Sequence, residues 1–487
     1  MYSMLASIAL LVIGYLLYGR FVEKVFGADP ARPTPAHTMT DGVDYVVMPS
    51  WKVFMIQFLN IAGTGPIFGA ILGAMYGPSC YLWIVFGCIF GGAVHDYLSG
   101  MLSVRNGGKG LPDLVGIYLG SGTRKLMLFF AVFMLMLVGA VFVYSPAIIL
   151  GDLVGGGTKS AVLIWVGVIL LYYVIATMVP IDKLIGKIYP LFAFALIFMA
   201  VALLACLIGK WPAGIPEVWG GLANRNPEGG RIFPCLFISI ACGAVSGFHA
   251  TQSPLMARCI GNEKMGRPIF YGAMITEGVI ALIWATVSSW FFFAGGNAEM
   301  GAESVKAAPA VVTSVSRYWL GTFGSILAIL GVVAAPITSG DTALRSARLM
   351  VADALHLNQQ PLKNRLGVSL CLFVLTGGLL VYNIMDAQGF NVLWGYFGWA
   401  NQTLSIFTFW TLTVFLVQHR KGSLYYLVTL LPACFMTAVC VAFILTAKIG
   451  FRIPQDFAPA IGAVTFVLAA CMFFLINRKK LSHYELA

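Results

Sequence analysis

Runs of about 20 apolar residues recur along nearly the whole chain, and no other feature restricts the possible fold as strongly. A helix of about 20 apolar residues crosses the hydrocarbon core of a bilayer. Of the 487 residues, 59% are hydrophobic and 10% are charged, whereas a soluble domain carries roughly 25% charged residues. The sequence therefore predicts an all-α polytopic membrane protein with about 13 transmembrane helices. The predicted spans are residues 2–19, 51–76, 81–103, 127–150, 161–179, 188–209, 233–257, 269–293, 320–343, 367–384, 389–417, 424–447 and 457–477.

Lys and Arg are distributed unevenly between alternate loops of this layout. The loops on one side of the membrane carry 22 of the 30 Lys and Arg residues. Cytoplasmic loops of membrane proteins show such an excess. We therefore expect a multi-pass protein of the inner (plasma) membrane, with the N-terminus outside and the C-terminus in the cytoplasm. The first run, 2–19, lacks a preceding basic segment and a small-residue cleavage site, so we interpret it as an anchor rather than a signal peptide.

The same excess of basic loops explains the net charge of +11. The sequence has no basic cluster interleaved with aromatic residues, so we do not expect it to bind nucleic acid. None of the ten cysteines forms a CxxC pair, and most lie in apolar runs, which is typical of small buried side chains rather than of disulfides or a zinc site. We expect no cofactor other than a possible bound Na⁺, for the reason given below.

The stretch FLNIAGTGPIFGAILG at 58–73 is apolar enough to cross a membrane but has helix-breaking residues at its centre. A break at membrane depth is tolerated where it lines a cavity or packs inside the protein, and it frees carbonyl groups on one half-helix and N–H groups on the other. The alternative interpretation is a glycine-rich packing face, since Gly69 and Gly73 form a GxxxG pattern. The candidate site residues in this stretch are Asn60, Gly63, Thr64, Gly65 and Pro66.

A second soft stretch, SIACGAVSGFHATQSPLMAR at 239–258, lies five spans later and should therefore run in the opposite direction. Interrupted helices at matching positions of two inverted halves are the best sequence indication of a secondary-transporter site. The candidate site residues here are Ser246, Gly247, His249 and Gln252. The predicted organisation is an anchor helix with a cytoplasmic loop (1–50), a first five-helix repeat (51–209), an extracytoplasmic linker (210–232), a second, inverted five-helix repeat (233–417), and two trailing helices with a short cytoplasmic tail (418–487).

A third pattern, APITS at 335–339, places the Ala335 carbonyl and the hydroxyls of Thr338 and Ser339 on one helix face. Pro336 cannot donate a backbone hydrogen bond, which leaves a carbonyl free one turn earlier. Oxygen ligands of this kind suit a hard cation such as Na⁺. The alternative is that both hydroxyls bond back to carbonyls of their own helix.

Five titratable residues at membrane depth are candidates for proton coupling: His95, Asp96, His249, Glu277 and Asp341. Adjacent side chains point in different directions on a helix, so the His95–Asp96 pair is not by itself a relay; the alternative to a functional role is that both residues bond to neighbouring loops. Glu277 has no obvious partner and is a candidate proton carrier. Asp341 has Arg345 four residues on, so a structural ion pair is equally expected there.

Four further residues are predicted to form a gate or wall of the substrate site, with an interfacial aromatic belt as the alternative: Trp394, Trp399, Asn401 and Gln402. Of these, Trp394 and Asn401 are the candidate substrate-binding residues. No Lys or Arg lies at the middle of a predicted span. A substrate carboxylate would therefore depend on the partial positive charge of half-helix N-termini.

The arrangement of interrupted helices resembles that of LeuT-like transporters with five-plus-five inverted repeats. By that resemblance, a Na⁺ site would use the carbonyls near Leu59, Ala62 and Ala335 and the hydroxyls of Thr338 and Ser339. The chain more closely resembles the carbon starvation protein A family. The motifs that carry this resemblance are GTGPIFGAILGAMYG (63–77), LWIVFGCIFGGAVHDYLSG (82–100), SGFHATQSPLMARCI (246–260), APITSGDTALRSARL (335–349) and LWGYFGWANQ (393–402).

Members of that family look like inner-membrane importers induced when carbon is scarce, with peptides or pyruvate as assigned substrates. The resemblance therefore implies a symporter working by alternating access, coupled to H⁺ or Na⁺. A Na⁺-coupled amino-acid importer is the alternative within the class. A membrane-embedded enzyme or nutrient sensor is the alternative outside it, but the sequence has no GxSxG, HExxH or GxGD motif. Oligomeric state and stoichiometry are left open.

Overall fold

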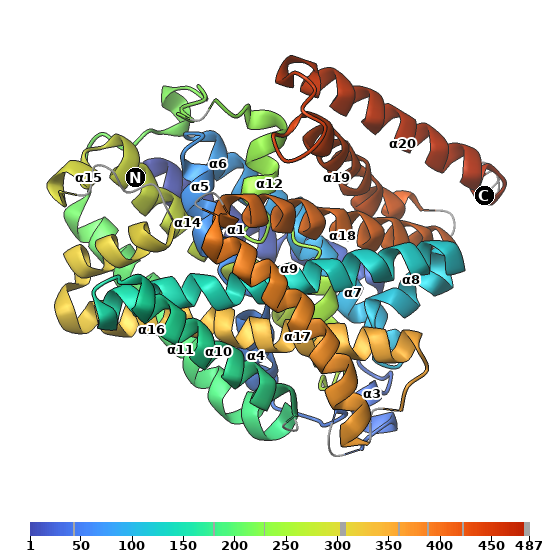
Figure 1. Cartoon of the computed structure of the whole chain (residues 1–487). Helices are drawn as coiled ribbons and strands as arrows, with labels where there is room; N and C mark the ends of the chain where they lie inside the picture. The colour runs from blue at the N-terminus through green and yellow to red at the C-terminus, as the bar shows by residue number, and fades with distance from the viewer. Residues whose placement is uncertain are drawn as a thin grey trace.

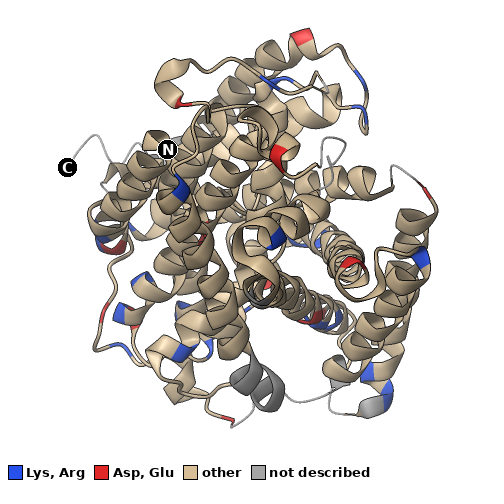
Figure 2. Ribbon diagram, turned by 90° about the vertical axis from the view of Figure 1, so that its left-hand side faces the viewer, with Lys and Arg blue, Asp and Glu red and all other residues tan. Residues whose placement is uncertain are grey.

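The computed structural model describes residues 1–41, 44–178, 181–227, 229–301, 308–358, 361–386, 389–420 and 423–481, and the regular structure in these ranges is helical throughout (Figure 1). The end of the predicted cytoplasmic tail, 482–487, lies outside the described residues. Long stretches of the ribbon carry no charged residue (Figure 2), as the apolar runs predict.

Eleven helices of the described chain are long and apolar enough to cross a membrane, and a bent helix pair is a twelfth span. The predicted total of thirteen is therefore not confirmed. The remaining predicted segment, 233–257, consists of short helical pieces on either side of a break. The long helices are α9 (Ser121–Gly155), α10 (Lys159–Met178), α11 (Ile181–Lys210), α14 (Gly272–Phe293), α16 (Ala308–Ala354), α17 (Leu362–Met385), α18 (Gly389–His419), α19 (Leu427–Thr446) and α20 (Ala458–Leu481).

Two more spans are assembled from shorter pieces. The first comprises α1 (Tyr2–Leu16) and α2 (Tyr18–Phe26). The other comprises α6 (Ser79–Leu82), the π-helix η2 (Trp83–Gly92) and α7 (Ala93–Arg105). A ten-residue π-helix is uncommon, and π segments are frequent at functional sites. α20 packs on α19 at the edge of the molecule (Figure 1).

Both predicted breaks are present. α4 (Ser50–Ile61) ends before the glycine cluster, and the chain resumes as η1 (Gly65–Gly69) and α5 (Ala70–Ala74) after a bend of 55°. In the second segment, η4 (Ile232–Leu236) and α12 (Phe237–Ser239) are separated from α13 (His249–Ala257) by turns. Clustered glycine and proline weaken a helix by roughly 1 and 3 kcal/mol per residue, so the local sequence accounts for both interruptions.

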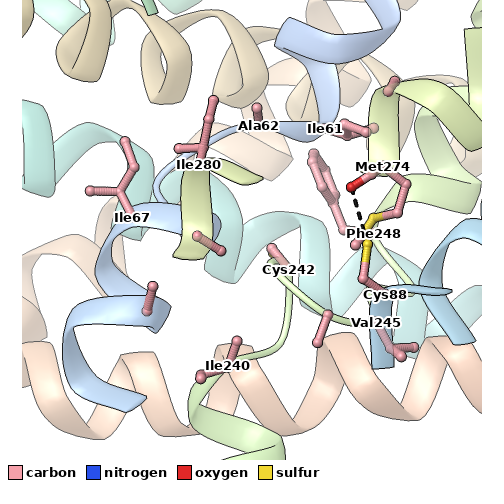
Figure 3. Close-up of a cluster of buried hydrophobic side chains, with 14 of the residues drawn as sticks. Ile61, Ala62, Ile67, Cys88, Ile240, Cys242, Val245, Phe248, Met274 and Ile280 are labelled. Atoms are coloured by element: carbon pink, nitrogen blue, oxygen red, sulfur yellow. Dashed lines mark hydrogen bonds between the residues drawn. The ribbon is translucent and has the colours of Figure 1, made fainter. Parts of the chain in front are cut away.

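The two broken segments pack directly on each other, because glycines allow their backbones to approach closely. A Cβ at Gly65 would overlap the Cys242 side chain, and a Cβ at Gly69 would lie 2.8 Å from the Ser239 carbonyl oxygen. A Cβ at Gly73 would overlap Ile240. The packing interpretation of the GxxxG pattern is thus correct for these glycines, and it holds together with the break. Figure 3 shows the apolar side chains of both segments, including Ile61, Ile67, Ile240 and Cys242, gathered around the crossing.

Candidate functional site

The first break carries buried polar groups that the protein leaves without partners. The Asn60 side chain is fully buried, and neither its amide oxygen nor its amide nitrogen has a hydrogen-bond partner among the described residues. The same is true of the Thr64 hydroxyl and of the amide oxygen of Gln57, one turn before Asn60. A buried polar group without a partner costs about 1–3 kcal/mol, so such a cluster indicates a place where a polar ligand binds. Gln57 was not predicted, although its spacing of three residues from Asn60 places both on one face.

The second break is held open by Asn401 of α18. Its Oδ1 accepts hydrogen bonds from the Phe248 backbone N–H at 2.7 Å and from the Ser246 hydroxyl at 3.1 Å. The Asn401 carbonyl also accepts from the Gly247 N–H at 3.2 Å, and a Cβ at Gly247 would overlap this backbone. The predicted residues Ser246, Gly247 and Asn401 are therefore brought together. The side-chain oxygen of Asn401 serves to pair backbone that the break leaves unpaired.

Four of the five predicted proton-coupling residues form one buried cluster. The Asp96 carboxylate lies between two imidazoles, 2.8 Å from His95 Nδ1 and 2.7 Å from His249 Nδ1. The other nitrogen of His249, Nε2, lies 3.5 Å from Glu277 Oε2. All four side chains are fully buried, and they come from α7, α13 and α14. The alternative, in which His95 and Asp96 bond to loops, does not describe these contacts: rotation about their side-chain bonds lets the two adjacent residues meet.

The chemistry of Asp96 determines how protons are arranged in this cluster. An ionised carboxylate only accepts hydrogen bonds, so both histidines must donate from Nδ1. Nε2 of His249 is then the nitrogen that can gain or lose a proton, and it faces Glu277. Neither Glu277 oxygen has a hydrogen-bond partner in the described chain. One proton can therefore occupy either Glu277 or His249, and the two positions are 3.5 Å apart.

The remaining predicted wall residues close the gap between the two breaks. Trp394 is buried, with ring centroids 5.9 Å from Phe68 and 5.4 Å from Phe397. The gap that Trp394 lines with Gly65 and Cys242 is too narrow for a water molecule. Trp394 is thus part of the interior and not of an interfacial belt. Gln252 donates to the Thr251 hydroxyl at 2.8 Å, and its amide oxygen has no partner within the described ranges.

The predicted Na⁺ ligands meet in part. Ser339 Oγ donates to the carbonyl oxygens of Leu59 and Asn60 at 3.1 and 3.2 Å, so α16 lies against the end of α4. The Thr338 hydroxyl bonds back to the carbonyls of Ala334 and Ala335, both at 2.9 Å, as the alternative interpretation expected. The Ala62 backbone N–H donates a hydrogen bond to the Phe58 carbonyl oxygen at 2.8 Å. These oxygens retain lone pairs that suit a hard cation, although the set holds no negative charge.

The fifth titratable candidate, Asp341, lies apart from the cluster. Its Oδ1 is 3.8 Å from Arg345 Nη2, and its Oδ2 accepts from the Tyr189 hydroxyl at 3.5 Å. The ion pair expected from the spacing is present. α16 continues to Ala354, beyond the predicted end at 343, and so carries Arg345 and Arg348 inside a spanning helix, both buried. The sequence predicts no Arg at the middle of a span, but in the structure the last third of this spanning helix contains two buried arginines.

A cavity of about 650 Å³ opens beside α13 on the side that carries most Lys and Arg residues. Thr251 and Pro254 of α13 line it, together with Lys109, Arg124 and Arg258. Since Thr251 is two residues from His249 and bonds to Gln252, the cavity reaches the polar groups of the second half-helix.

The family model for carbon starvation protein CstA matches residues 1–164, 157–319 and 304–442. The chain belongs to the carbon starvation protein CstA family. This agrees with the motifs identified in the sequence, which fall in the α4–α5, α7, α13, α16 and α18 regions described above.

Among its relatives, an uncharacterized membrane protein of Haemophilus influenzae is 46% identical over 58% of this chain and 90% of its own length. The peptide transporter CstA of Escherichia coli is 26% identical over 93% of this chain and 82% of its own. The pyruvate/proton symporter BtsT of the same organism is 25% identical with the same coverage. A manganese transporter of Eremococcus coleocola has the same fold, with a TM-score of 0.57 and 11% identity over 92% of this chain and 99% of its own. The relatives' names identify a transporter family, which points away from an enzyme.

Proposed function

We propose that this protein is a proton-coupled symporter that imports pyruvate-like carboxylates or small peptides across the inner membrane by alternating access. The observation that carries the proposal is the buried cluster of two carboxylates and two imidazoles, in which His249 is the first residue of a half-helix. A relative named as a pyruvate/proton symporter and others named as peptide transporters support this class of substrate and ion.

Proton binding in the cluster follows from the cost of burying charge. An ionised carboxylate without a hydrogen-bond donor is strongly unfavourable in an apolar interior. Asp96 has two donors, whereas Glu277 has His249 Nε2 at 3.5 Å and no other polar neighbour that bonds to it in the described chain. Asp96 therefore stays ionised, and Glu277 with His249 holds the transported proton. Release of that proton leaves the buried Glu277 carboxylate ionised, and water or substrate must then solvate this charge. Proton release therefore requires the site to open.

The substrate binds at the first break, where Asn60, Thr64 and Gln57 offer unpaired donors and acceptors. Amides and hydroxyls of this kind pair with a carboxylate or a peptide group. The N-terminal end of the half-helix η1–α5 adds a partial positive charge to the same place. Gln252 of the other broken segment has an amide oxygen that is likewise without a partner among the described residues, and it is a further candidate substrate ligand.

We further propose that residues 51–209 and 233–417 are two inverted five-helix repeats, with the broken segments as their matching first helices. The shared fold with a solved transporter and the two interruptions support this organisation. The cavity beside α13 lies on the Lys/Arg-rich side, which we assign to the cytoplasm. The opposite approach, at Gly65, Cys242 and Trp394, is closed. We therefore propose an inward-facing state with a cytoplasmic C-terminus and an N-terminus outside; the cavity beside α13 and the closed gap at Trp394 support it.

Sodium coupling is a second candidate, favoured by the contact of Ser339 with the carbonyls of Leu59 and Asn60. In that case Leu59, Ala62, Ala335, Thr338 and Ser339 would hold Na⁺ during transport. The proton is preferred because the titratable cluster combines charges and exchangeable protons, whereas the Ser339 group is neutral.

Uptake by proteoliposomes tests both proposals. Labelled pyruvate and a labelled dipeptide are offered under an imposed pH gradient, an imposed Na⁺ gradient, or neither. Accumulation driven by the pH gradient is the expected result. Accumulation driven by Na⁺ alone would replace the proton by the second candidate, and transport of neither compound under any gradient would refute the symporter proposal.

A further inference from the structure

Arg348 is a buried cation to which the protein offers no anion. Its side chain is 5% exposed, and its Nε and Nη1 atoms have no hydrogen-bond acceptor in the part of the chain that the structure describes. No carboxylate of that part lies within 4.0 Å of its nitrogens, although Arg345 on the same helix has such a partner in Asp341. An uncompensated buried charge is strongly unfavourable, and intramembrane arginines are paired as a rule.

With Arg348 itself, three arginines share this region with two carboxylates. Arg345 and Arg365 repel the Arg348 guanidinium electrostatically, while Asp44 and Asp341 attract it more weakly. Asp341 is already engaged by Arg345 and by the Tyr189 hydroxyl. Arg365 lies in the first turn of α17, where a positive charge opposes the helix dipole, and its Nε also lacks an acceptor among the described residues. α16 packs against α17, and Arg348 lies six residues before the end of α16 while Arg365 lies three residues after the start of α17. Both guanidinium groups therefore lie near the connection between two packed helices.

We propose that Arg348 and Arg365 form a binding site for an oxyanion, and that its occupant is the phosphate group of an anionic membrane lipid. Guanidinium groups bind phosphate in bidentate fashion and more strongly than neutral partners do. Basic pockets between spanning helices on the cytoplasmic side bind anionic lipid headgroups.

The surroundings of Arg365 favour a lipid over a free ion. The lipid-facing side of α17 exposes Leu366, Leu370 and Val374 by 45%, 65% and 64%; these residues are four apart, share one face, and begin directly after Arg365. A headgroup at Arg365 would therefore place its acyl chains along an apolar helix face. Arg348 is nine residues beyond Ser339, about 13 Å along α16, so this site is distinct from the proposed substrate and ion sites.

The test is a thermal-stability titration of the purified full chain in a neutral detergent. Phosphatidylglycerol is added in one arm, phosphatidylcholine in a second, and sodium phosphate or sodium acetate in a third. We expect Tm to rise with phosphatidylglycerol and not with phosphatidylcholine. In Arg348→Met the apparent affinity for phosphatidylglycerol should fall about tenfold or more. Arg452→Met, which removes an exposed arginine that bonds only to the Lys448 carbonyl among the described residues, should titrate like the native chain.

Arg365→Gln, farther from the interior, should weaken the same response if Arg348→Met proves hard to purify. A rise in Tm with phosphate or acetate that depends on Arg348 would support the oxyanion site and identify a free anion as its occupant. No rise with any anion, or an equal rise in Arg348→Met, would overturn the proposal. Because the measurement is of binding, it is independent of whether transport is proton-coupled.

Discussion

Glu277 and Glu263 allow the same substitution to be compared at two buried positions with opposite surroundings. Glu263 accepts hydrogen bonds from the Asp29 N–H at 2.8 Å and from Arg105 Nε and Nη2 at 3.3 and 3.2 Å, and it is also 3.8 Å from Arg32. Glu277 accepts none from the described residues, and within 4.0 Å it has one basic partner in that part of the chain, His249. Glu263→Gln therefore removes the anionic partner of Arg105, whose side chain is 18% exposed, which costs about 1–3 kcal/mol. Glu277→Gln removes no hydrogen bond and should change the free energy of unfolding by less than about 1 kcal/mol, or increase it.

The effects on transport should be reversed. Glutamine cannot exchange a proton, so Glu277→Gln should abolish accumulation of labelled substrate driven by a pH gradient. Counterflow, in which labelled and unlabelled substrate exchange without a gradient, should persist because the substrate contacts of the first break are intact. Glu263→Gln should lower Tm but keep the pH-driven accumulation of whatever protein folds. The assay is uptake and counterflow in the same proteoliposomes, normalised to folded protein. Gradient-driven accumulation by Glu277→Gln would refute the assignment of the proton to this residue.

Three further substitutions test the breaks and the ion. Asn401→Leu leaves the buried Phe248 N–H without its acceptor and should cost about 1–3 kcal/mol, measured as a lower Tm; an unchanged Tm would contradict the role of Asn401 in holding the second break. Ser339→Ala should leave proton-driven uptake intact and remove any stimulation by Na⁺, measured by uptake with and without the ion; loss of proton-driven uptake would instead place Ser339 in the proton pathway. Gly65→Val should stop transport, because the added side chain forces the broken segments apart at Cys242. Gly122→Val is the control and should transport normally, since a Cβ there has nothing within 4 Å. Normal uptake by Gly65→Val would show that the close contact is dispensable.

The breaks could be predicted from the sequence because they depend on local chemistry. Glycines within a few residues of one another weaken any helix, whatever surrounds it, and both interruptions occur where glycines cluster, joined by Pro66 at the first. Pro254, by contrast, lies inside the continuous helix α13. The limits of α16 could not be predicted in this way. Arg345 and Arg348 looked like the polar end of a span, but neighbouring helices bury them and the helix continues to Ala354. The π-helix η2 also escaped prediction, since its apolar residues fit an α-helical pattern equally well.

The composition of the proton cluster was predicted, but its geometry was not. His95, Asp96, His249 and Glu277 are each unusual at membrane depth, and that is visible in the sequence. Asp96 and His249 are separated by 153 positions, so their hydrogen bond depends on how α7 packs against α13. A single sequence contains no information on which distant side chains meet. The sequence therefore identifies the groups that carry chemistry, whereas the structure identifies Asp96 as the residue that orients both imidazoles.

If the protein is proton-coupled as proposed, the position of His249 gives a short physical route from protonation to conformation. Phe248, the last residue of the second break, is held through its N–H by Asn401 of α18. His249, the next residue, is held by Asp96 of α7 and faces Glu277 of α14. One peptide unit is thus attached to three helices, two of them through groups that carry charge. Movement of α18 relative to α7 and α14 must therefore change the distances on which the proton depends, and a change of protonation must alter the forces on the break. Coupling of this kind needs no pathway of intermediate residues, because His249 of the proposed proton site directly follows Phe248 of the second break in the chain.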